Sequence, residues 1–343
     1  MARELILITG VSGYIGFKTM RIALAQGYKV RAVVRKEAQV ESLRSHSQIA
    51  RHVDNVEFVV VPDMAKMGAF DGVMEGVSVV LHLASPLAIE TDDYGRDILR
   101  PAMNIESSVL SSAIMTPSVR RVVITSSAVT LIPITWLGTT DTDTTFSSKD
   151  LNTDTAGPYP NSMAAYWASK ALARAHVHEF LTERKPHFDI IQLLPSVVIG
   201  PDDLATDLAT LQVGTRGMVL PIVKGVKMDM PLVGTPVLAD DVAKAHVDAI
   251  KSSIPGNKDY ILSSDAPEGI AWNAMNEIAK KYFPQEVESG LIPCGGSLPT
   301  RKWKLDTSDT EAAFGWECTS FEETVRRLLE QYIALSRKTT TAS

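Results

Sequence analysis

The sequence predicts an α/β fold: a doubly wound parallel sheet with helices on both faces, followed by a smaller mixed C-terminal lobe. Three observations indicate this architecture. A buried strand leads into a glycine-rich turn and a helix at the start of the chain. Apolar strands then alternate with helical segments up to about residue 200, an order that implies right-handed crossovers between parallel strands. Beyond that residue the predicted elements become shorter and mixed in type.

The composition is that of an ordinary globular chain. Apolar residues make up 45% and charged residues 22% of its 343 residues, which suits one large domain or two modest ones. The net charge of −6 argues against a general nucleic-acid surface. No apolar run approaches the ~18 residues of a membrane span, and a strand begins too early for a cleaved signal peptide to precede it. The two cysteines, Cys294 and Cys318, lack metal-binding spacing. We therefore expect a cytoplasmic protein without a metal site.

The first strand and the turn after it are the segment around which the chain is organised. Four apolar residues of Leu5–Thr9 lead into glycines spaced G-x-x-G-x-x-G, and a helical pattern follows as far as Gly27. One glycine permits the tight turn, another lets the backbone approach a pyrophosphate, and the third lets helix and strand pack closely. The pattern predicts a Rossmann-type dinucleotide site, with contacts from Gly10, Gly13, Tyr14, Ile15 and Gly16.

The second strand, at 28–35, ends in a basic residue. In NAD-binding proteins an acidic residue about 20 positions beyond the glycines holds the ribose 2′-hydroxyl. Here that place is taken by Val34 and Arg35, with Lys36 next. A guanidinium pairs with a 2′-phosphate, whereas a carboxylate would repel it. We therefore predict NADPH in preference to NADH; the alternative is that Arg35 is a solvated surface charge.

The third and fourth strands continue the alternation. Strand three, at 56–61, is followed by Asp63 and Met64, where an adenine lies in this architecture. Asp63 either accepts a hydrogen bond from the adenine or caps the helix expected after it, and the sequence favours neither. Strand four, at 77–84, is hydrophobic on both faces, as parallel sheets require. A long helix follows at 92–115, with Pro101 marking a kink or a break.

The fifth strand and the helix after it carry the candidate chemistry. The strand, at 121–127, ends in Ser126 and Ser127, and the helix at 163–183 places Tyr166 and Lys170 four residues apart on one face. A nearby ammonium favours the phenolate and lowers the pKa of a phenol. Such a pair can exchange a proton with a carbonyl or alcohol oxygen while hydride moves to or from a cofactor. A serine hydroxyl at the end of a neighbouring strand can hold that oxygen.

Each of these features has an ordinary alternative when taken alone. The Tyr166–Lys170 pair would be a surface pair, and the two serines would bond the local backbone. Their joint arrangement is more informative, because all of them fall at the carboxyl edge of one sheet, where open α/β folds bind ligands. After a sixth strand at 189–194 we expect the boundary between domains. The dinucleotide domain is predicted over 1–200, with parts of 234–262 returning to it, the substrate lobe over 201–336, and a frayed tail over 337–343.

Four motifs resemble the extended short-chain dehydrogenase/reductases: Thr9-Gly-x-x-Gly-Tyr-Ile-Gly16, Leu81-His-Leu-Ala-Ser-Pro86, Thr125-Ser-Ser127 and Tyr166-x-x-x-Lys170. Over roughly 4–250, the chain is most similar to the branch of dihydroflavonol reductases, cinnamoyl-CoA reductases and fungal NADPH-dependent aldehyde (carbonyl) reductases. The resemblance implies that Ser127 binds the carbonyl oxygen, that Tyr166 is the acid and that Lys170 also binds the nicotinamide ribose. It implies further cofactor contacts from Leu83, Ala84, Ser85, Thr125, Pro195, Val197 and Val198. One departure is the run Met103-Asn-Ile-Glu106, where the family usually has a glycine at or near Ile105.

The predicted function is NADPH-dependent reduction of an aldehyde or ketone, by a monomer or homodimer acting on a small-molecule carbonyl compound. The candidate substrate residues are largely apolar: Leu87, Trp136, Met163 and Met218. One alternative is a nucleotide-sugar epimerase or dehydratase that retains NAD through its cycle. Another is a non-catalytic regulator that senses a dinucleotide, although such a protein has no need of Tyr166 and Lys170.

Overall fold

The computed structural model describes residues 4–86, 88–138 and 143–342 and divides into two compact units. The first consists of Met1–Trp136, Ser148–Leu194 and Ala243–Tyr260. The second consists of Leu137–Ser147, Pro195–Val242 and Ile261–Ser343. Each unit is therefore assembled from segments that lie far apart in the sequence.

A seven-stranded sheet forms the centre of the first unit, with the strand order β11-β7-β5-β4-β1-β2-β3. The pairings from β7 to β3 are all parallel. The order reverses between β1 and β4, which is the point where open α/β sheets bind ligands outside their carboxyl ends. The strands are β1 (Leu5–Thr9), β2 (Lys29–Val34), β3 (Val56–Val60), β4 (Val79–His82), β5 (Arg121–Thr125), β7 (Asp189–Pro195) and β11 (Lys258–Leu262).

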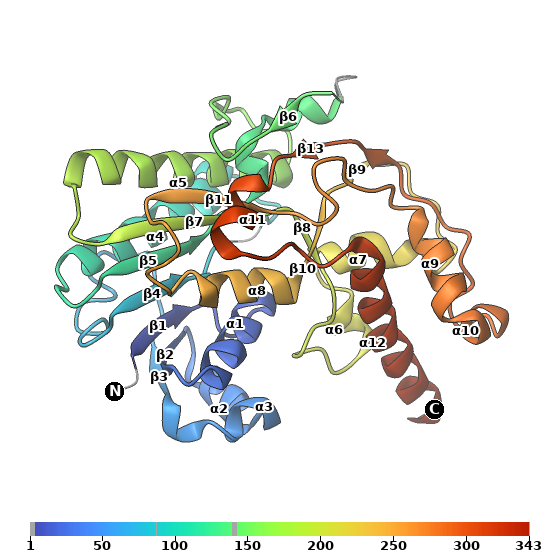
Figure 1. The fold of residues 1–343 in the computed structure, drawn as a ribbon, viewed down its shortest axis with the longest axis horizontal. Coiled ribbons are helices and arrows are strands. Elements are labelled where there is room, and N and C mark those ends of the chain that lie inside the picture. Colours follow the sequence, from blue (N-terminus) through green and yellow to red (C-terminus); the bar gives the residue numbers. More distant parts are fainter. Residues whose placement is uncertain (1–3, 87, 139–142, 343) are drawn as a thin grey trace. The chain divides into compact units, whose positions relative to one another are not determined.

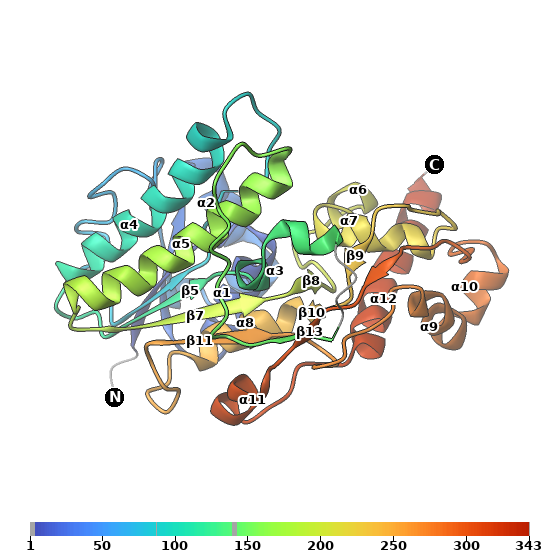
Figure 2. The same ribbon diagram turned by 90° about the horizontal axis from the view of Figure 1, so that it is seen from above.

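Helices cover both faces of this sheet, which confirms the predicted doubly wound fold. Figures 1 and 2 show α4 and α5 side by side on one face and α1 and α8 on the other. The helices are α1 (Tyr14–Ala25), α2 (Glu37–Ser45), α3 (Ser47–Ala50), η1 (Val53–Asn55), η2 (Gly95–Leu99), α4 (Arg100–Ile114), η3 (Ala128–Leu131), η4 (Ile134–Gly138), α5 (Ser162–Arg184) and α8 (Ala239–Asp248). Of these, α8 begins and η4 ends in the second unit.

The helix predicted over 92–115 differs from the observed one. A π-helical turn, η2, comes first, and α4 begins only at Arg100. Pro101 therefore lies in the first turn of α4, which agrees with the predicted break at this residue and not with a kink inside a longer helix. This position suits proline, because the N–H groups of the first turn have no partner within a helix in any case.

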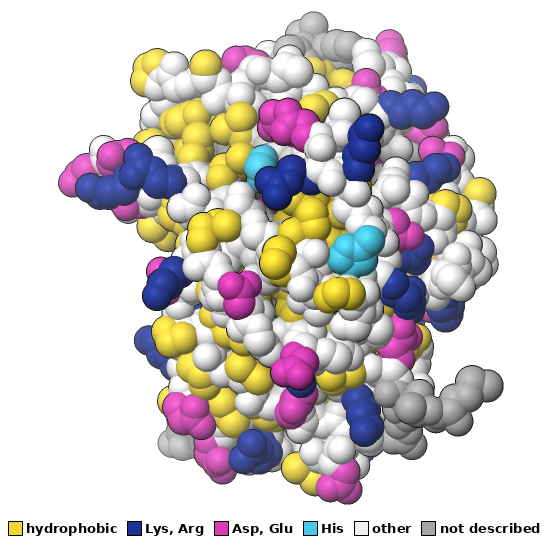
Figure 3. Space-filling model, turned by 90° about the vertical axis from the view of Figure 1, so that its left-hand side faces the viewer, with side chains coloured by type: hydrophobic (Ala, Val, Ile, Leu, Met, Phe, Trp, Pro, Cys, Tyr) yellow, Lys and Arg dark blue, Asp and Glu magenta, His cyan; other side chains and the backbone are white. Residues whose placement is uncertain are grey.

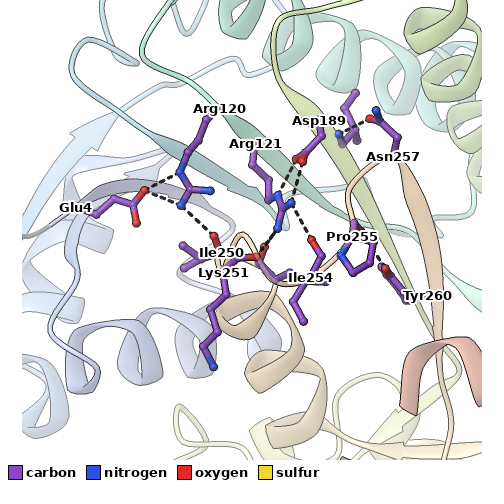
Figure 4. Close-up of polar contacts among 12 residues, drawn as sticks. Glu4, Arg120, Arg121, Asp189, Ile250, Lys251, Ile254, Pro255, Asn257 and Tyr260 are labelled. Carbon is purple, nitrogen blue, oxygen red and sulfur yellow. Dashed lines mark hydrogen bonds and ion pairs between the residues drawn. The ribbon is translucent and has the colours of Figure 1, made fainter. Parts of the chain in front are cut away.

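Two adjacent arginines hold the end of α8 and the loop after it against the sheet (Figure 4). Arg121 pairs with Asp189 through two bonds of 2.6 and 2.8 Å, which joins the amino-terminal ends of β5 and β7. Arg120 pairs with Glu4, which precedes β1. The same guanidinium groups donate to backbone carbonyl groups of Ala249, Ile250, Lys251 and Ile254. The loop is thereby fixed by side chains of the sheet.

The second unit combines short parallel strand pairs with helices. Its two-stranded sheets pair β10 with β8, β12 with β9 and β13 with β6. Trp272 and Trp303 are buried in this unit. Its strands are β6 (Thr145–Phe146), β8 (Val197–Ile199), β9 (Leu232–Val233), β10 (Pro236–Leu238), β12 (Thr300–Arg301) and β13 (Lys304–Leu305). Its helices are α6 (Leu208–Leu211), α7 (Thr215–Val219), η5 (Leu220–Ile222), α9 (Ala274–Tyr282), α10 (Pro284–Glu288), α11 (Ser308–Phe314) and α12 (Phe321–Ala342).

The surface carries charges of both signs. On the face drawn in Figure 3, Lys and Arg side chains are interspersed with Asp and Glu, and no continuous basic patch forms there. The net charge of the whole chain is −6. Within the described ranges, no helix has the length and apolar character needed to cross a membrane.

Candidate active site

The turn between β1 and α1 is built so closely that only glycine fits at two positions. Gly10 has a φ of +76°, and a Cβ there would lie 2.9 Å from the backbone nitrogen of Ala84. A Cβ on Gly16 would lie 2.0 Å from the carbonyl oxygen of Gly10. The N-cap of α1 is Gly13, which supplies no side-chain cap to the first N–H groups of the helix. The turn thus presents a positive helix end that fits a phosphate group.

A cleft of about 790 Å³ in the first unit opens at this turn. Its volume lies in the range of small-molecule and cofactor sites. The cleft brings together most of the residues predicted to contact a cofactor: Gly10, Gly13, Tyr14, Ile15, Gly16, Arg35, Asp63, Met64, Leu83, Ala84, Ser85 and Thr125. Its lining also includes residues that were not predicted as site residues, among them Ser12, Gln39, Ala65 and Ile105. Lys36, Ser127, Tyr166 and Lys170 are not part of this lining.

The end of β2 is tied to the glycine turn by a residue that the sequence analysis missed. Oε1 of Gln39 accepts from the backbone N–H groups of Arg35 and Lys36, at 3.0 and 3.1 Å. Nε2 of the same side chain donates to Oγ of Ser12 at 2.9 Å. Gln39 stands three residues after Lys36, the N-cap of α2, and glutamine at that spacing is a capping signal in the sequence. Arg35 itself is exposed at the cleft.

The side chain of Asp63 forms a hydrogen bond with the backbone two residues further along the chain. One of its carboxylate oxygens accepts from the N–H of Ala65 at 3.0 Å, and a series of turns follows instead of a regular helix. Asp63 also lines the cleft, so a contact with an adenine stays a prediction.

A buried histidine at the end of β4 has a defined protonation state. The hydroxyl oxygen of Thr9 accepts from the N–H groups of Leu83 and Ala84, both at 3.0 Å. Its own proton is therefore donated to Nδ1 of His82, at 2.8 Å. Burial, reinforced by the charge of Lys170, lowers the pKa of His82 to about 3. The ring is thus neutral and carries its proton on Nε2.

A second, much smaller cavity of about 10 Å³ lies beside the cleft and shares Ala84, Ser85, Pro86 and Thr125 with it. His82, Glu106 and Lys170 are the titratable groups in its lining. Burial raises the pKa of Glu106 to about 7, against the opposing effect of Lys170. The remaining lining residues are Ala102 and Ala173. Glu106 was not predicted as a site residue, although it belongs to the run noted as a departure from the family.

The three predicted catalytic residues come from two neighbouring elements. Asn161 caps α5 by accepting from the N–H of Ala164, so the helix begins just before Tyr166. One turn later, Nζ of Lys170 lies 5.9 Å from the centroid of the Tyr166 ring. Tyr166 is half-buried and Lys170 is buried. Ser127 follows β5, is buried, and its Oγ accepts from the N–H of Val129 at 3.3 Å.

The predicted substrate residues that the structure describes belong to both units. Trp136 is buried in the first unit, whereas Met163 is exposed at the start of α5. Met218 belongs to the second unit, as do Pro195, Val197 and Val198, which were predicted to lie near a nicotinamide. Leu87 lies outside the described residues.

Comparisons with known proteins agree with this architecture. The model of the NAD dependent epimerase/dehydratase family matches residues 6–262. A ketoreductase of Cercospora nicotianae, CTB6, is 33% identical, with 98% of this chain and 97% of the relative covered. A putative NADPH-dependent methylglyoxal reductase of Candida albicans, GRP2, is 27% identical over 96% of this chain and 98% of its own. The crystal structure of yeast methylglyoxal/isovaleraldehyde reductase Gre2 complexed with NADPH has a TM-score of 0.82 and 26% identity, covering 97% of this chain and 99% of that one.

These matches confirm the resemblance to the extended short-chain dehydrogenase/reductases. The ketoreductase and the yeast reductase match almost the whole chain. The relatives named as reductases share its fold, and its glycine turn fits a dinucleotide phosphate. The chain therefore belongs to the NAD dependent epimerase/dehydratase family and is an NAD(P)-dependent oxidoreductase.

Proposed function

We propose that the protein reduces an aldehyde or ketone to the alcohol at the expense of NADPH. The observation that carries this proposal is the placement of Lys170 beside the ring of Tyr166, at 5.9 Å. The cavity that Lys170 lines shares four residues with the cleft of the glycine turn. A proton-donating pair thus adjoins a cleft that fits a dinucleotide. The names of the relatives, two of them reductases of ketones or of methylglyoxal, support this reaction.

The cleft residues would hold the cofactor. Gly10, Gly13 and the first N–H groups of α1 would bind its pyrophosphate, because a helix N-terminus attracts negative charge. Arg35 would pair with the 2′-phosphate, since its guanidinium is exposed at the cleft and its backbone is held by Gln39. When bound, NADPH supplies the hydride that reaches the carbonyl carbon.

Three residues of the chain would carry out the proton transfer to the carbonyl oxygen. Tyr166 donates its phenolic proton to the carbonyl oxygen as the alcohol forms. Lys170 stabilises the resulting phenolate with its positive charge and also binds the ribose of the cofactor. Ser127 accepts a hydrogen bond from Val129, so its hydroxyl proton remains for the substrate oxygen. Leu87, Trp136, Met163 and Met218 stay predicted substrate residues, and Pro195, Val197 and Val198 stay predicted cofactor contacts.

The test is a panel of apolar aldehydes and ketones offered to the purified protein with NADPH or NADH. The proposal predicts loss of NADPH absorbance, one alcohol formed per NADPH consumed, and slower consumption of NADH. Tightly bound NAD after purification, without net consumption of coenzyme, would instead support a nucleotide-sugar epimerase or dehydratase. NADPH binding with no turnover across the panel would support a dinucleotide-sensing regulator.

A further inference from the structure

A carboxyl group lies buried next to the proposed catalytic lysine. Glu106 projects from α4 and is only 8% exposed, and Lys170 on α5 is 7% exposed. Both side chains line the cavity of about 10 Å³ beside the cleft. Oε2 of Glu106 is buried without a hydrogen-bond partner among the described atoms. A carboxyl group in this position is costly to bury, so its charge state must respond to the groups around it.

The cavity offers this carboxyl group complementary partners. His82 lines it from β4, and Nε2 of His82 is buried with no hydrogen-bond partner among the residues that the structure describes. Because Thr9 fixes the proton of His82 on Nε2, that nitrogen is a donor. Lys170 supplies further N–H donors, and Glu106 is an acceptor. The volume is that of about one water molecule, which has the two to four polar partners that a buried water requires.

We propose that Glu106 is a positioning residue for the reduction: it holds the ammonium of Lys170 through a water molecule in this cavity and thereby sets how strongly that ammonium acts on the phenol of Tyr166. This inference rests on the proposed function, because it takes Tyr166 as the proton donor. It gives a residue of α4, Glu106, a role in the reaction of Tyr166 and Lys170 on α5. The Tyr-x-x-x-Lys motif contains no such residue.

The direction of the effect follows from the charges. Lys170 favours the phenolate of Tyr166, and an ionised Glu106 behind Lys170 opposes part of that effect. Around neutral pH Glu106 changes from its neutral to its ionised form. The titratable groups that face it are Lys170 from α5 and His82 from β4, and His82 stays neutral in this range. His176 of α5 is bonded to the neighbouring Ser107. An ionised Glu106 therefore weakens the effect of the Lys170 ammonium on the phenol of Tyr166.

The test compares the pH profile of carbonyl reduction in wild type and in Glu106→Gln, which keeps the shape of the side chain without its charge. The inference predicts that the basic limb of the profile moves to lower pH by about half a unit or more in the variant. The dissociation constant for NADPH should change less than about twofold. Glu183→Gln, the same change at an exposed carboxylate of α5, should leave the profile unchanged. Superimposable profiles for wild type and Glu106→Gln would overturn the inference.

A second measurement detects the ionisation of the Glu106 carboxyl group directly and does not require catalytic turnover. Infrared difference spectra of the wild type between pH 5 and 9 should show a protonated carboxylic acid that ionises near neutral pH, absent from Glu106→Gln. Lys170→Met should move this ionisation to higher pH, because it removes the stabilising ammonium. A wild-type spectrum without such a group overturns the inference even where Glu106→Gln does not fold. If instead the wild type reduces no carbonyl compound, the proposed function fails while this spectrum still reports on Glu106.

Discussion

Gly16 lies directly against Gly10: a Cβ at residue 16 would lie 2.0 Å from the carbonyl oxygen of residue 10. No side chain fits at that separation without moving the backbone of the turn. This contact sets how closely α1 packs on the end of β1, and so where the helix N-terminus points. Cofactor binding should depend on it directly.

Gly16→Ala should therefore displace the turn and weaken NADPH binding at least tenfold, since the phosphate would lose its alignment with the helix end. Fluorescence titration with NADPH measures this, and circular dichroism checks that the variant is folded. The matched control is Gly138→Ala, where an added Cβ meets open space. Wild-type affinity in Gly16→Ala would mean that the turn does not bind the cofactor.

Arg35 should determine the choice of coenzyme. In Arg35→Asp the 2′-phosphate meets a carboxylate instead of a guanidinium, so the preference should move from NADPH to NADH by about tenfold to a hundredfold. The ratio of kcat/KM for the two coenzymes is the measurement. Arg51→Asp places the same charge change at an exposed position outside the cleft and should not alter the ratio. An unchanged preference in Arg35→Asp would refute the assignment of this residue.

Arg121 should matter for stability rather than for catalysis. It is 3% exposed, pairs with Asp189 and binds three carbonyl groups of the segment after α8. Lysine keeps the charge but not the forked donors, so Arg121→Lys should lower the free energy of unfolding by about 2–4 kcal/mol. Urea unfolding followed by circular dichroism tests this. Arg96→Lys, at an exposed pair with Asp97, should leave stability nearly unchanged, and an equal loss in both variants would contradict the account.

Glu106 should make stability depend on pH with a definite sign. Its pKa is about 7 in the folded chain against an ordinary value of 4.5, so the folded state holds its proton more tightly. Ionisation of Glu106 therefore takes nothing from the free energy of unfolding below pH 4.5. The loss grows to about 3 kcal/mol as the pH rises through 7. Glu106→Gln should gain stability relative to wild type between pH 5 and 8 in urea titrations. If the free energies of unfolding of wild type and Glu106→Gln differ by the same amount at pH 5 and at pH 8, Glu106 is ionised over this whole range, which contradicts the prediction.

The sequence carried enough information for the sheet, the glycine turn and the place of Arg35. Each of these depends on local patterns: buried strands are runs of Val, Ile and Leu, and the turn needs glycine where no Cβ fits. The sequence analysis expected one helix over 92–115 with Pro101 at a kink or a break, and of these two alternatives the structure fits the break. The pattern did not show that a π-helical turn precedes the helix and leaves proline in its first turn.

Other features depend on tertiary contacts that no periodicity encodes. Glu106 stands in a helix of mixed composition, and only the packing of α4 against α5 and β4 shows that its carboxyl group faces inward. The same holds for Gln39, whose amide reaches Ser12 across 27 residues of sequence. The tautomer of His82 follows only from the three bonds made by Thr9. Polar side chains that contact distant segments were therefore the part of the site that sequence analysis left out.

The most direct test of the proton-transfer assignment is single-turnover reduction of a carbonyl compound by Tyr166→Phe with NADPH already bound. Removing the phenolic hydroxyl should slow hydride consumption by about a hundredfold to ten-thousandfold, while the dissociation constant for NADPH stays within about twofold of wild type. A variant that consumes NADPH at the wild-type rate would contradict the assignment of Tyr166 as the proton donor.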